Sequence, residues 1–156
     1  MAVSVFFDTS VLLAGLIDFG EQSAPAQELM DLVADDAVAR PGTAWHCCLE
    51  FYSVATRLPA EFRLTPDHAF QLLDREVFAR MSVHDLPGTN RGAFFEVSVR
   101  DGITGGRIYD AHIAEVARIA GASVVVTDNR RHFLTALRHG LRIASPREFL
   151  SSLDRK

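Results

Sequence analysis

Two short apolar runs, each followed at once by acidic and hydroxyl-bearing residues, constrain the fold of this chain more than any other feature. Residues 3–7 are largely apolar and end in Asp-Thr-Ser, and residues 123–126 repeat the pattern and end in Thr-Asp-Asn. Short apolar runs of this kind are typical of strands buried on both faces of a parallel sheet. Each run therefore predicts a buried strand, and the first predicts a helix that starts directly after it.

Helical patterns alternate with further strand candidates along the rest of the chain. We expect helices at about residues 9–17, 24–36, 43–57, 66–79, 89–101 and 107–120. Additional strands are expected at residues 37–40, 82–86 and 141–144. Helices that alternate with short apolar strands indicate an α/β fold. The expected architecture has three layers, α/β/α, with a central, mainly parallel sheet.

Size and composition set the class of protein. The 156 residues fit one domain over residues 1–156, because domains usually contain about 100 to 200 residues. A content of 48% hydrophobic and 23% charged residues excludes a disordered or disulfide-built chain. The adjacent Cys47 and Cys48 are poorly spaced for a mutual disulfide and indicate reduced core residues. Without a basic leader or an apolar stretch near the roughly 18 residues of a membrane span, we expect a cytoplasmic protein with no membrane partner.

Charge is divided unevenly between the two parts of the chain. Residues 1–102 contain 7 basic and 15 acidic side chains, whereas residues 103–156 contain 9 basic and 5 acidic ones. A basic C-terminal third beside acidic catalytic residues would suit a polyanion that approaches a metal site. A solvated, arginine-rich surface explains the same pattern, so charge alone leaves both interpretations open.

Asp8 and Asp128 follow the two predicted buried strands. Open parallel sheets bind their ligands outside the carboxyl ends of the strands, near the topological switch point. The two carboxylates could therefore converge at one edge of the sheet although they are 120 positions apart. The alternative is that each acid is a helix N-cap, a role that stabilises by roughly 1 kcal/mol.

Two further acids lie inside predicted helices. Asp110 is near the first turn of a largely buried helix, where an ionised carboxylate needs a cation or hydrogen-bond donors. Its structural alternative is an ion pair with Arg107, one turn earlier. Glu50 shares a polar helical stripe with His46, which is either the wall of a polar cleft or the wet face of an amphipathic helix. We assign His46 no catalytic role.

The candidate catalytic set is Asp8, Glu50, Asp110 and Asp128. Carboxylates gathered at one edge would repel, since unit charges 4 Å apart interact by about 4 kcal/mol at an effective dielectric of 20. A divalent cation removes that penalty, and oxygen-only ligands favour Mg²⁺ or Mn²⁺. Such an ion lowers the pKa of water and stabilises charge on a phosphate. The acids therefore indicate metal-dependent hydrolysis of phosphodiesters.

Four segments, taken in order, carry a resemblance to a known family. They are FFDTSVLL, LEFYSVATRLP, ITGGRIYDAHIAEVARIAG and VVVTDNRRHF. Together they resemble the PIN-domain ribonucleases, especially the VapC toxins of bacterial toxin–antitoxin pairs, over nearly the whole chain. The resemblance implies that Asp8, Glu50 and Asp110 belong to the metal site, with Asp8 and Asp110 as direct ligands. The family pattern of Thr, any residue, then Asp or Asn aligns Asn129 with the fourth position and leaves Asp128 one place early, so either residue can fill it.

The resemblance also implies an activity and partners. The implied protein is a homodimeric, Mg²⁺-dependent endoribonuclease toxin that cuts single-stranded or loop RNA, inhibits translation and is neutralised by a cognate VapB-like antitoxin. In it, Glu50 orients or deprotonates water. Secondary candidates for holding water or substrate are Thr9, Ser10 and Thr127, although helix capping also explains Ser10. Candidates for contacts with the RNA backbone are Arg130, Arg131 and Arg138.

Other classes of protein fit the acids less well. A phosphorelay receiver domain would need adjacent acids after the first strand and a lysine after a late strand, but Asp8 has no acidic neighbour and the only lysine is Lys156. A haloacid-dehalogenase-type phosphatase would need Asp-x-Asp, and this chain has Asp-Thr-Ser. A catalytically silent PIN-like module that binds RNA or protein remains the alternative.

Overall fold

A five-stranded parallel sheet forms the centre of the computed structural model, which describes residues 3–154 apart from the side chains of residues 135, 138 and 139. The strands are β1 (Val5–Phe7), β2 (Pro41–Ala44), β3 (Ser82–His84), β4 (Val124–Val126) and β5 (Arg142–Ala144). Their order is β3-β2-β1-β4-β5, and every neighbouring pair is parallel. The predicted α/β class and parallel sheet are confirmed.

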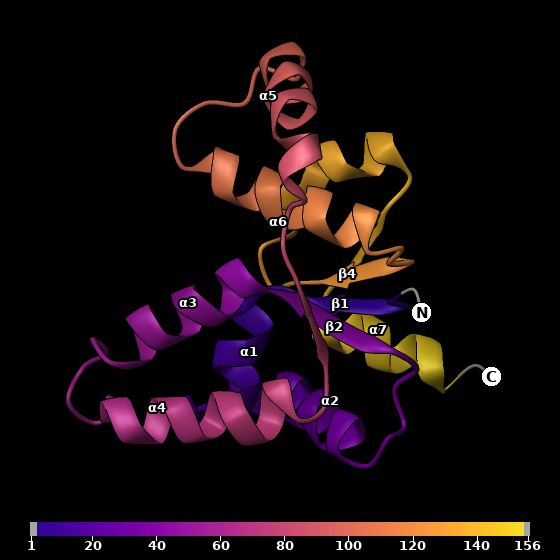
Figure 1. Ribbon diagram of the computed structural model, residues 1–156. Coiled ribbons are helices and arrows are strands. Elements are labelled where there is room, and N and C mark those ends of the chain that lie inside the picture. Colours follow the sequence, from indigo (N-terminus) through magenta and orange to yellow (C-terminus); the bar gives the residue numbers. More distant parts are fainter. Residues whose placement is uncertain (1–2, 155–156) are drawn as a thin grey trace.

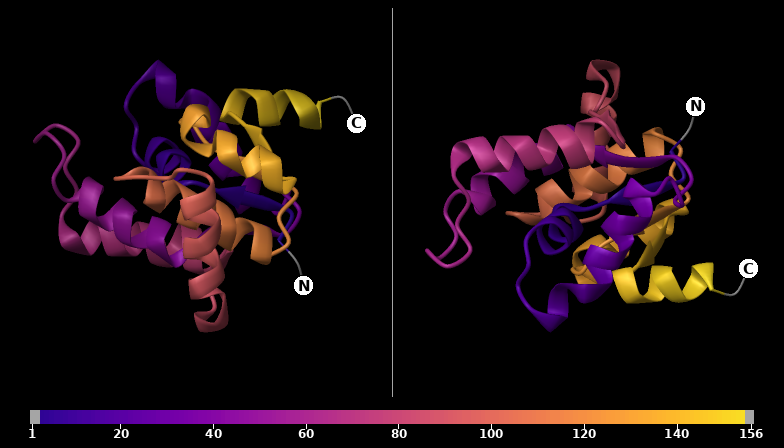
Figure 2. Two further views of the ribbon diagram at one scale, coloured as in Figure 1. Left: turned by 90° about the horizontal axis from the view of Figure 1, so that it is seen from above. Right: turned by 90° about the horizontal axis from the view of Figure 1, so that it is seen from below.

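Helices cover both faces of this sheet (Figures 1 and 2). One side carries α1 (Thr9–Leu16), α2 (Ala24–Ala34) and α7 (Pro146–Leu153), and the other carries α5 (Arg91–Arg100), α6 (Arg107–Ile119) and the 3-10 helix η4 (Arg130–His139). Figure 1 shows α3 (Trp45–Ala55) and α4 (Pro66–Leu72) extending beyond the sheet. Shorter turns are η1 (Glu21–Ser23), the π-helical η2 (Leu73–Phe78) and η3 (Gly88–Asn90). The three expected layers are therefore present.

The position of β1 decides where the chain can build a site. β2 and β3 lie on one side of β1, and β4 and β5 lie on the other, so the strand order reverses between β1 and β4. Both strands are buried along their whole length, as their apolar sequences predict. The carboxyl ends of β1 and β4 thus meet at the topological switch point, where open α/β sheets bind ligands.

The second strand lies elsewhere than the sequence predicts. The strand expected at residues 37–40 is wrong, because β2 runs over residues 41–44 and α3 begins at residue 45. Asp36 and Arg40 adopt left-handed conformations, with φ of 55° and 43°, and therefore place a turn in the expected strand. Gly42 permits close approach of β2 to β1, since a Cβ there would lie 2.8 Å from Cγ2 of Val3.

Several helices also differ from the expected ranges. The helix expected over residues 66–79 divides into α4 and η2, and the one expected over residues 89–101 divides into η3 and α5. The sequence analysis missed α7, whose start is fixed by a capping box in which Ser145 and Glu148 bond each other's backbone. It also missed η4. The cysteines Cys47 and Cys48 are free and buried, as expected. No helix within residues 3–154 has the length and apolar character needed to cross a bilayer.

Candidate active site

Asp8 lies at the centre of the candidate site, directly after β1, and is 3% exposed. Its backbone N–H donates to the carbonyl of Val126 in β4 at 3.1 Å. Its Oδ2 accepts hydrogen bonds from Ser10 Oγ at 2.9 Å and from Thr127 Oγ1 at 2.7 Å. Asp8 occupies the N-cap position of α1, but its side chain caps none of the described amides of that helix. The carboxylate is held by two hydroxyls, so helix capping does not account for it.

The hydroxyls of Ser10 and Thr127 join the ends of the two central strands. Ser10 Oγ accepts from the backbone N–H of Asp128 at 3.1 Å, and Thr127 Oγ1 accepts from that of Asn129 at 2.9 Å. The sequence analysis names both residues as secondary candidates for holding water or substrate. Each hydroxyl both donates to Asp8 and accepts from the turn after β4, which fixes that turn against α1.

Thr9 and Cys47 lie beneath this carboxylate. Thr9 is 6% exposed, and its hydroxyl faces the Cys47 thiol. Burial, followed by the negative charge of Asp8, raises the pKa of Cys47 to about 12. The thiol therefore stays protonated. Because Thr9 is buried, its hydroxyl is not exposed at the surface of the site.

Asp128 and Asn129 are the two candidates for the fourth position of the site, and their surroundings differ. The charge of Asp8 acts on Asp128. Burial and then the charge of Asp8 raise the pKa of Asp128 above its ordinary value. Asn129 is the N-cap residue of η4 and contacts Thr127 through its backbone N–H. The Asn129 side chain makes no capping hydrogen bond to η4, so either residue stays a candidate for the fourth position.

Asp110 approaches the same place from the first turn of α6. Burial raises its pKa to about 6, and the charges of Asp8 and Glu50 act in the same direction. The nearby His132 and Arg107 oppose this shift, and Nδ1 of His132 lies 3.2 Å from Oδ2 of Asp110. Asp110 thus contacts His132 of η4, and Arg107, the partner expected from the sequence, acts on Asp110 through its charge.

Glu50 reaches the cluster from α3. Its side chain is 40% exposed, and Nε2 of His46 lies 2.6 Å from its Oε1. The His46 ring stacks on Tyr109 of α6, with ring centroids 5.5 Å apart and planes inclined by 8°. The polar stripe of α3 therefore faces α6 and forms a wall of the site, although Glu50 also reaches solvent.

We call the four acids Asp8, Glu50, Asp110 and Asp128 the carboxylate edge. They come from β1, α3, α6 and the turn after β4. Their ligand atoms are carboxylate oxygens, which Mg²⁺ and Mn²⁺ prefer. Among residues 3–154, no three acidic, histidine or cysteine side chains already surround one ion position. Burial, with the charges of Asp8 and Glu50 acting in the same direction, raises the pKa of Asp110, and a divalent cation would offset both effects, so these carboxylates fit such an ion.

Sequence reasoning missed His132 and Tyr109. His132 follows Asp128 by four positions in a segment for which the sequence analysis predicted no helix, and η4 brings it to Asp110. Tyr109 directly precedes Asp110, and that adjacency was the one signal available. The expected RNA-binding arginines lie close by in η4. Arg130 NH1 bonds both carboxylate oxygens of Glu148, at 3.0 and 3.2 Å, and Arg131 is exposed. The side chain of Arg138 lies outside the described residues.

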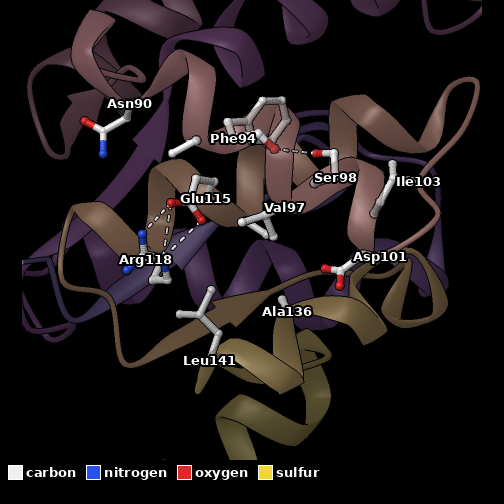
Figure 3. Close-up of a pocket in the computed structure, with 13 residues that line it drawn as sticks. Asn90, Phe94, Val97, Ser98, Asp101, Ile103, Glu115, Arg118, Ala136 and Leu141 are labelled. Carbon is white, nitrogen blue, oxygen red and sulfur yellow. Dashed lines mark hydrogen bonds and ion pairs between the residues drawn. The ribbon is translucent and has the colours of Figure 1, made fainter.

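A separate cavity of about 260 Å³ lies between α5 and α6 and is closed by Ala136 of η4 and by Leu141, which precedes β5 (Figure 3). We call it the helical cavity. Its wall is mostly apolar and includes Phe94, Val97 and Leu141, together with an ion pair between Glu115 and Arg118. None of the four acids of the carboxylate edge lines it. The helical cavity is therefore separate from the candidate active site.

Comparison with known proteins identifies relatives of this chain. The model of the family described as PIN domain matches residues 4–131. Ribonuclease VapC40 of Mycobacterium tuberculosis is 30% identical over 136 residues, which cover 79% of this chain and 85% of that protein.

Solved structures share the same architecture. DNA-bound VapBC from Salmonella typhimurium matches with a TM-score of 0.65 and 22% identity, covering 92% of this chain and 98% of that one. PAE2754 from Pyrobaculum aerophilum has a TM-score of 0.64 and 20% identity, covering 100% and 98%. The Mycobacterium tuberculosis toxin VapC20, described as cleaving the sarcin-ricin loop, has a TM-score of 0.59 and 18% identity, covering 78% and 87%. At these identities the likeness shows the fold.

Proposed function

This chain belongs to the PIN-domain family, and we propose that it is a metal-dependent endoribonuclease that uses the carboxylate edge. One observation carries the proposal: acids from β1, α3 and α6 and from the turn after β4 gather near the switch point of the sheet, where burial, with the charges of Asp8 and Glu50, raises the pKa of Asp110. Such a concentration of negative charge is costly without a cation. The ribonuclease VapC40, 30% identical, supports the same activity.

Each residue of the edge has a distinct role in this proposal. Asp8 and Asp110 hold Mg²⁺ or Mn²⁺, and Asp128, or alternatively Asn129, completes the site. The ion supplies positive charge against the phosphate and lowers the pKa of water. Glu50 accepts the proton of the attacking water, and the contact of 2.6 Å with His46 orients it. Ser10 and Thr127 fix the carboxylate of Asp8.

The substrate and partners follow from the relatives. We propose that the chain cuts single-stranded or loop RNA in the cytoplasm and thereby inhibits translation, as the description of VapC20 as a sarcin-ricin-loop-cleaving toxin supports. Because structural neighbours include VapBC complexes, we also propose a homodimer neutralised by a VapB-like antitoxin. A basic side chain of that antitoxin would enter the carboxylate edge, where a guanidinium forms strong paired hydrogen bonds with carboxylates.

One assay separates the proposed enzyme from its alternative, a silent PIN-like binding module. Purified protein is incubated with total cellular RNA in Mg²⁺, with and without EDTA, and the cut ends are mapped. The proposal predicts discrete cleavage sites that disappear with EDTA. Intact RNA in Mg²⁺, together with RNA binding, would instead support the silent module. Cleavage that persists in EDTA would contradict the metal site.

A further inference from the structure

An exposed aromatic ring borders the carboxylate edge. Tyr109 precedes Asp110 in α6 and is 56% exposed. Its ring stacks on His46 at a centroid distance of 5.5 Å and an angle of 8°, and His46 in turn contacts Glu50. A large exposed aromatic side chain is thus fixed in orientation by a residue that also orients an acid of the site. An exposed aromatic ring leaves apolar surface in water, which does not favour folding. A ring held in one orientation can stack on a flat partner.

We propose that Tyr109 is a stacking platform for one nucleobase of the RNA next to the bond that is cut. The inference rests on the proposed function and specifies its substrate as RNA with an unpaired, unstacked base beside the scissile phosphate. Proteins recognise single-stranded RNA by stacking splayed bases on aromatic rings. A base paired in a duplex has both faces covered, so the platform selects against duplex RNA.

The surroundings of the ring favour RNA over a protein partner. Tyr109 stacks on His46 of α3, and Arg107, two positions earlier in α6, carries a charge that lowers the pKa of Asp110. Arg107 is exposed at the start of α6 and offers a cation to a phosphate. A nucleotide whose phosphate lies at the carboxylate edge therefore finds a cation and a flat ring within the same turn of helix.

His46 has a second role in this arrangement. It is a positioning residue, because it stacks on the platform and also contacts Glu50, and its ring further meets His112 edge-on at 5.6 Å. A base that stacks on Tyr109 is thereby held at a fixed position relative to Glu50, the carboxylate that accepts the proton of water. The aromatic contact links recognition of the base to the position of the reacting phosphate.

The test is a double-mutant cycle between protein and RNA. An RNA that the protein cuts is compared with versions in which single nucleotides near the cut are abasic, using wild type, Tyr109→Leu and Tyr109→Phe. Stacking on an aromatic ring contributes a factor of about 5 to 150 in affinity. We expect Tyr109→Leu to raise KM by such a factor with little change in kcat, and Tyr109→Phe to restore it. The matched control Phe70→Leu removes an exposed ring on α4, 55% exposed, and should change nothing.

The cycle identifies the stacked base. At one position, removal of the base should raise KM for wild type and Tyr109→Phe but add nothing for Tyr109→Leu, because the shared contact is already lost. Penalties that add at every position would overturn the inference. Unchanged RNA kinetics with an altered oligomeric state of Tyr109→Leu in light scattering would also overturn it, and would make the ring a protein contact. If the wild type fails to cut RNA at all, the proposed function fails, and the same cycle measured as Kd by fluorescence anisotropy still decides the stacking.

Discussion

The carboxylate edge and the helical cavity are two regions of one molecule that differ in the kind of side chain they bring together. The edge gathers acids from four separate elements, and two hydroxyls hold its central carboxylate. The cavity is enclosed mainly by apolar side chains of α5 and α6 and has one ion pair in its wall (Figure 3). The difference teaches that the candidate catalytic acids lie where the sheet topology brings charges together, and not in the helical cavity.

The largest expected contrast between the two regions is in catalysis. Asp110→Asn should lower RNA cleavage in Mg²⁺ by at least about a hundredfold, which corresponds to about 2.7 kcal/mol of transition-state stabilisation. Glu115→Gln, on the same helix but in the wall of the cavity, is the matched control and should cleave as wild type does. Initial rates on one RNA measure both variants. Equal rates for Asp110→Asn and wild type would remove the distinction between the regions.

The burial of Asp110 among other acids should appear in the free energy of unfolding. The pKa of Asp110 is raised from 3.8 to about 6, so the folded state binds this proton more tightly than the unfolded state does. That contribution to stability is fully present below pH about 4 and is lost as the pH rises through 6. In EDTA, Asp110→Asn should therefore gain stability relative to wild type between pH 4 and pH 7.5, by on the order of 2 kcal/mol. Urea unfolding at the two pH values measures it, and a gain that does not grow with pH would contradict it.

Metal should stabilise the edge and leave the cavity unaffected. At neutral pH, Mg²⁺ at ten times its Kd should stabilise the wild type by about 1.4 kcal/mol. At pH 5 the gain should shrink, because Asp110, with its pKa of about 6, is then largely protonated. Thermal unfolding with and without Mg²⁺ at both pH values gives the result. Glu115→Gln should keep the full response, and an identical response in Asp110→Asn would place the ion elsewhere.

The smallest contrast concerns two buried hydroxyls. Thr127→Val removes a hydrogen bond of 2.7 Å to Asp8 that joins distant segments. Ser98→Ala, in the wall of the cavity, removes one of 2.8 Å to the carbonyl of Phe94 in its own helix. We expect Thr127→Val to cost about 1 kcal/mol of stability and to lower the cleavage rate several-fold, whereas Ser98→Ala should leave cleavage unchanged. Chemical denaturation and initial rates compare them, and equal cleavage rates would show that the hydroxyl does not orient Asp8.

The sequence predicted the edge better than its surroundings, for physical reasons. Buried parallel strands have continuous apolar sequences, so β1 and β4 and the acids after them could be located. The position of β2 depended on the left-handed conformations of Asp36 and Arg40. Such conformations are uncommon for residues other than glycine and could not be predicted from these residue types.

Contacts between distant elements were not predictable in the same way. The pairing of His132 with Asp110 and the stacking of Tyr109 on His46 depend on how η4 and α3 pack against α6. The sequence pattern of one segment does not specify which residues of another segment it contacts. The cavity lies between α5 and α6 and likewise depends on tertiary packing.

The most direct test of the carboxylate edge as a cation site is Mn²⁺ binding, measured by electron paramagnetic resonance on wild type, Asp8→Asn and Glu115→Gln. Asp8 is the buried centre of the edge, and its charge acts on both Asp110 and Asp128. We predict that wild type and Glu115→Gln bind Mn²⁺ with the same Kd, and that Asp8→Asn binds at least about tenfold more weakly, a loss of about 1.4 kcal/mol. Equal Mn²⁺ affinity in all three proteins, or no binding to the wild type, would contradict it.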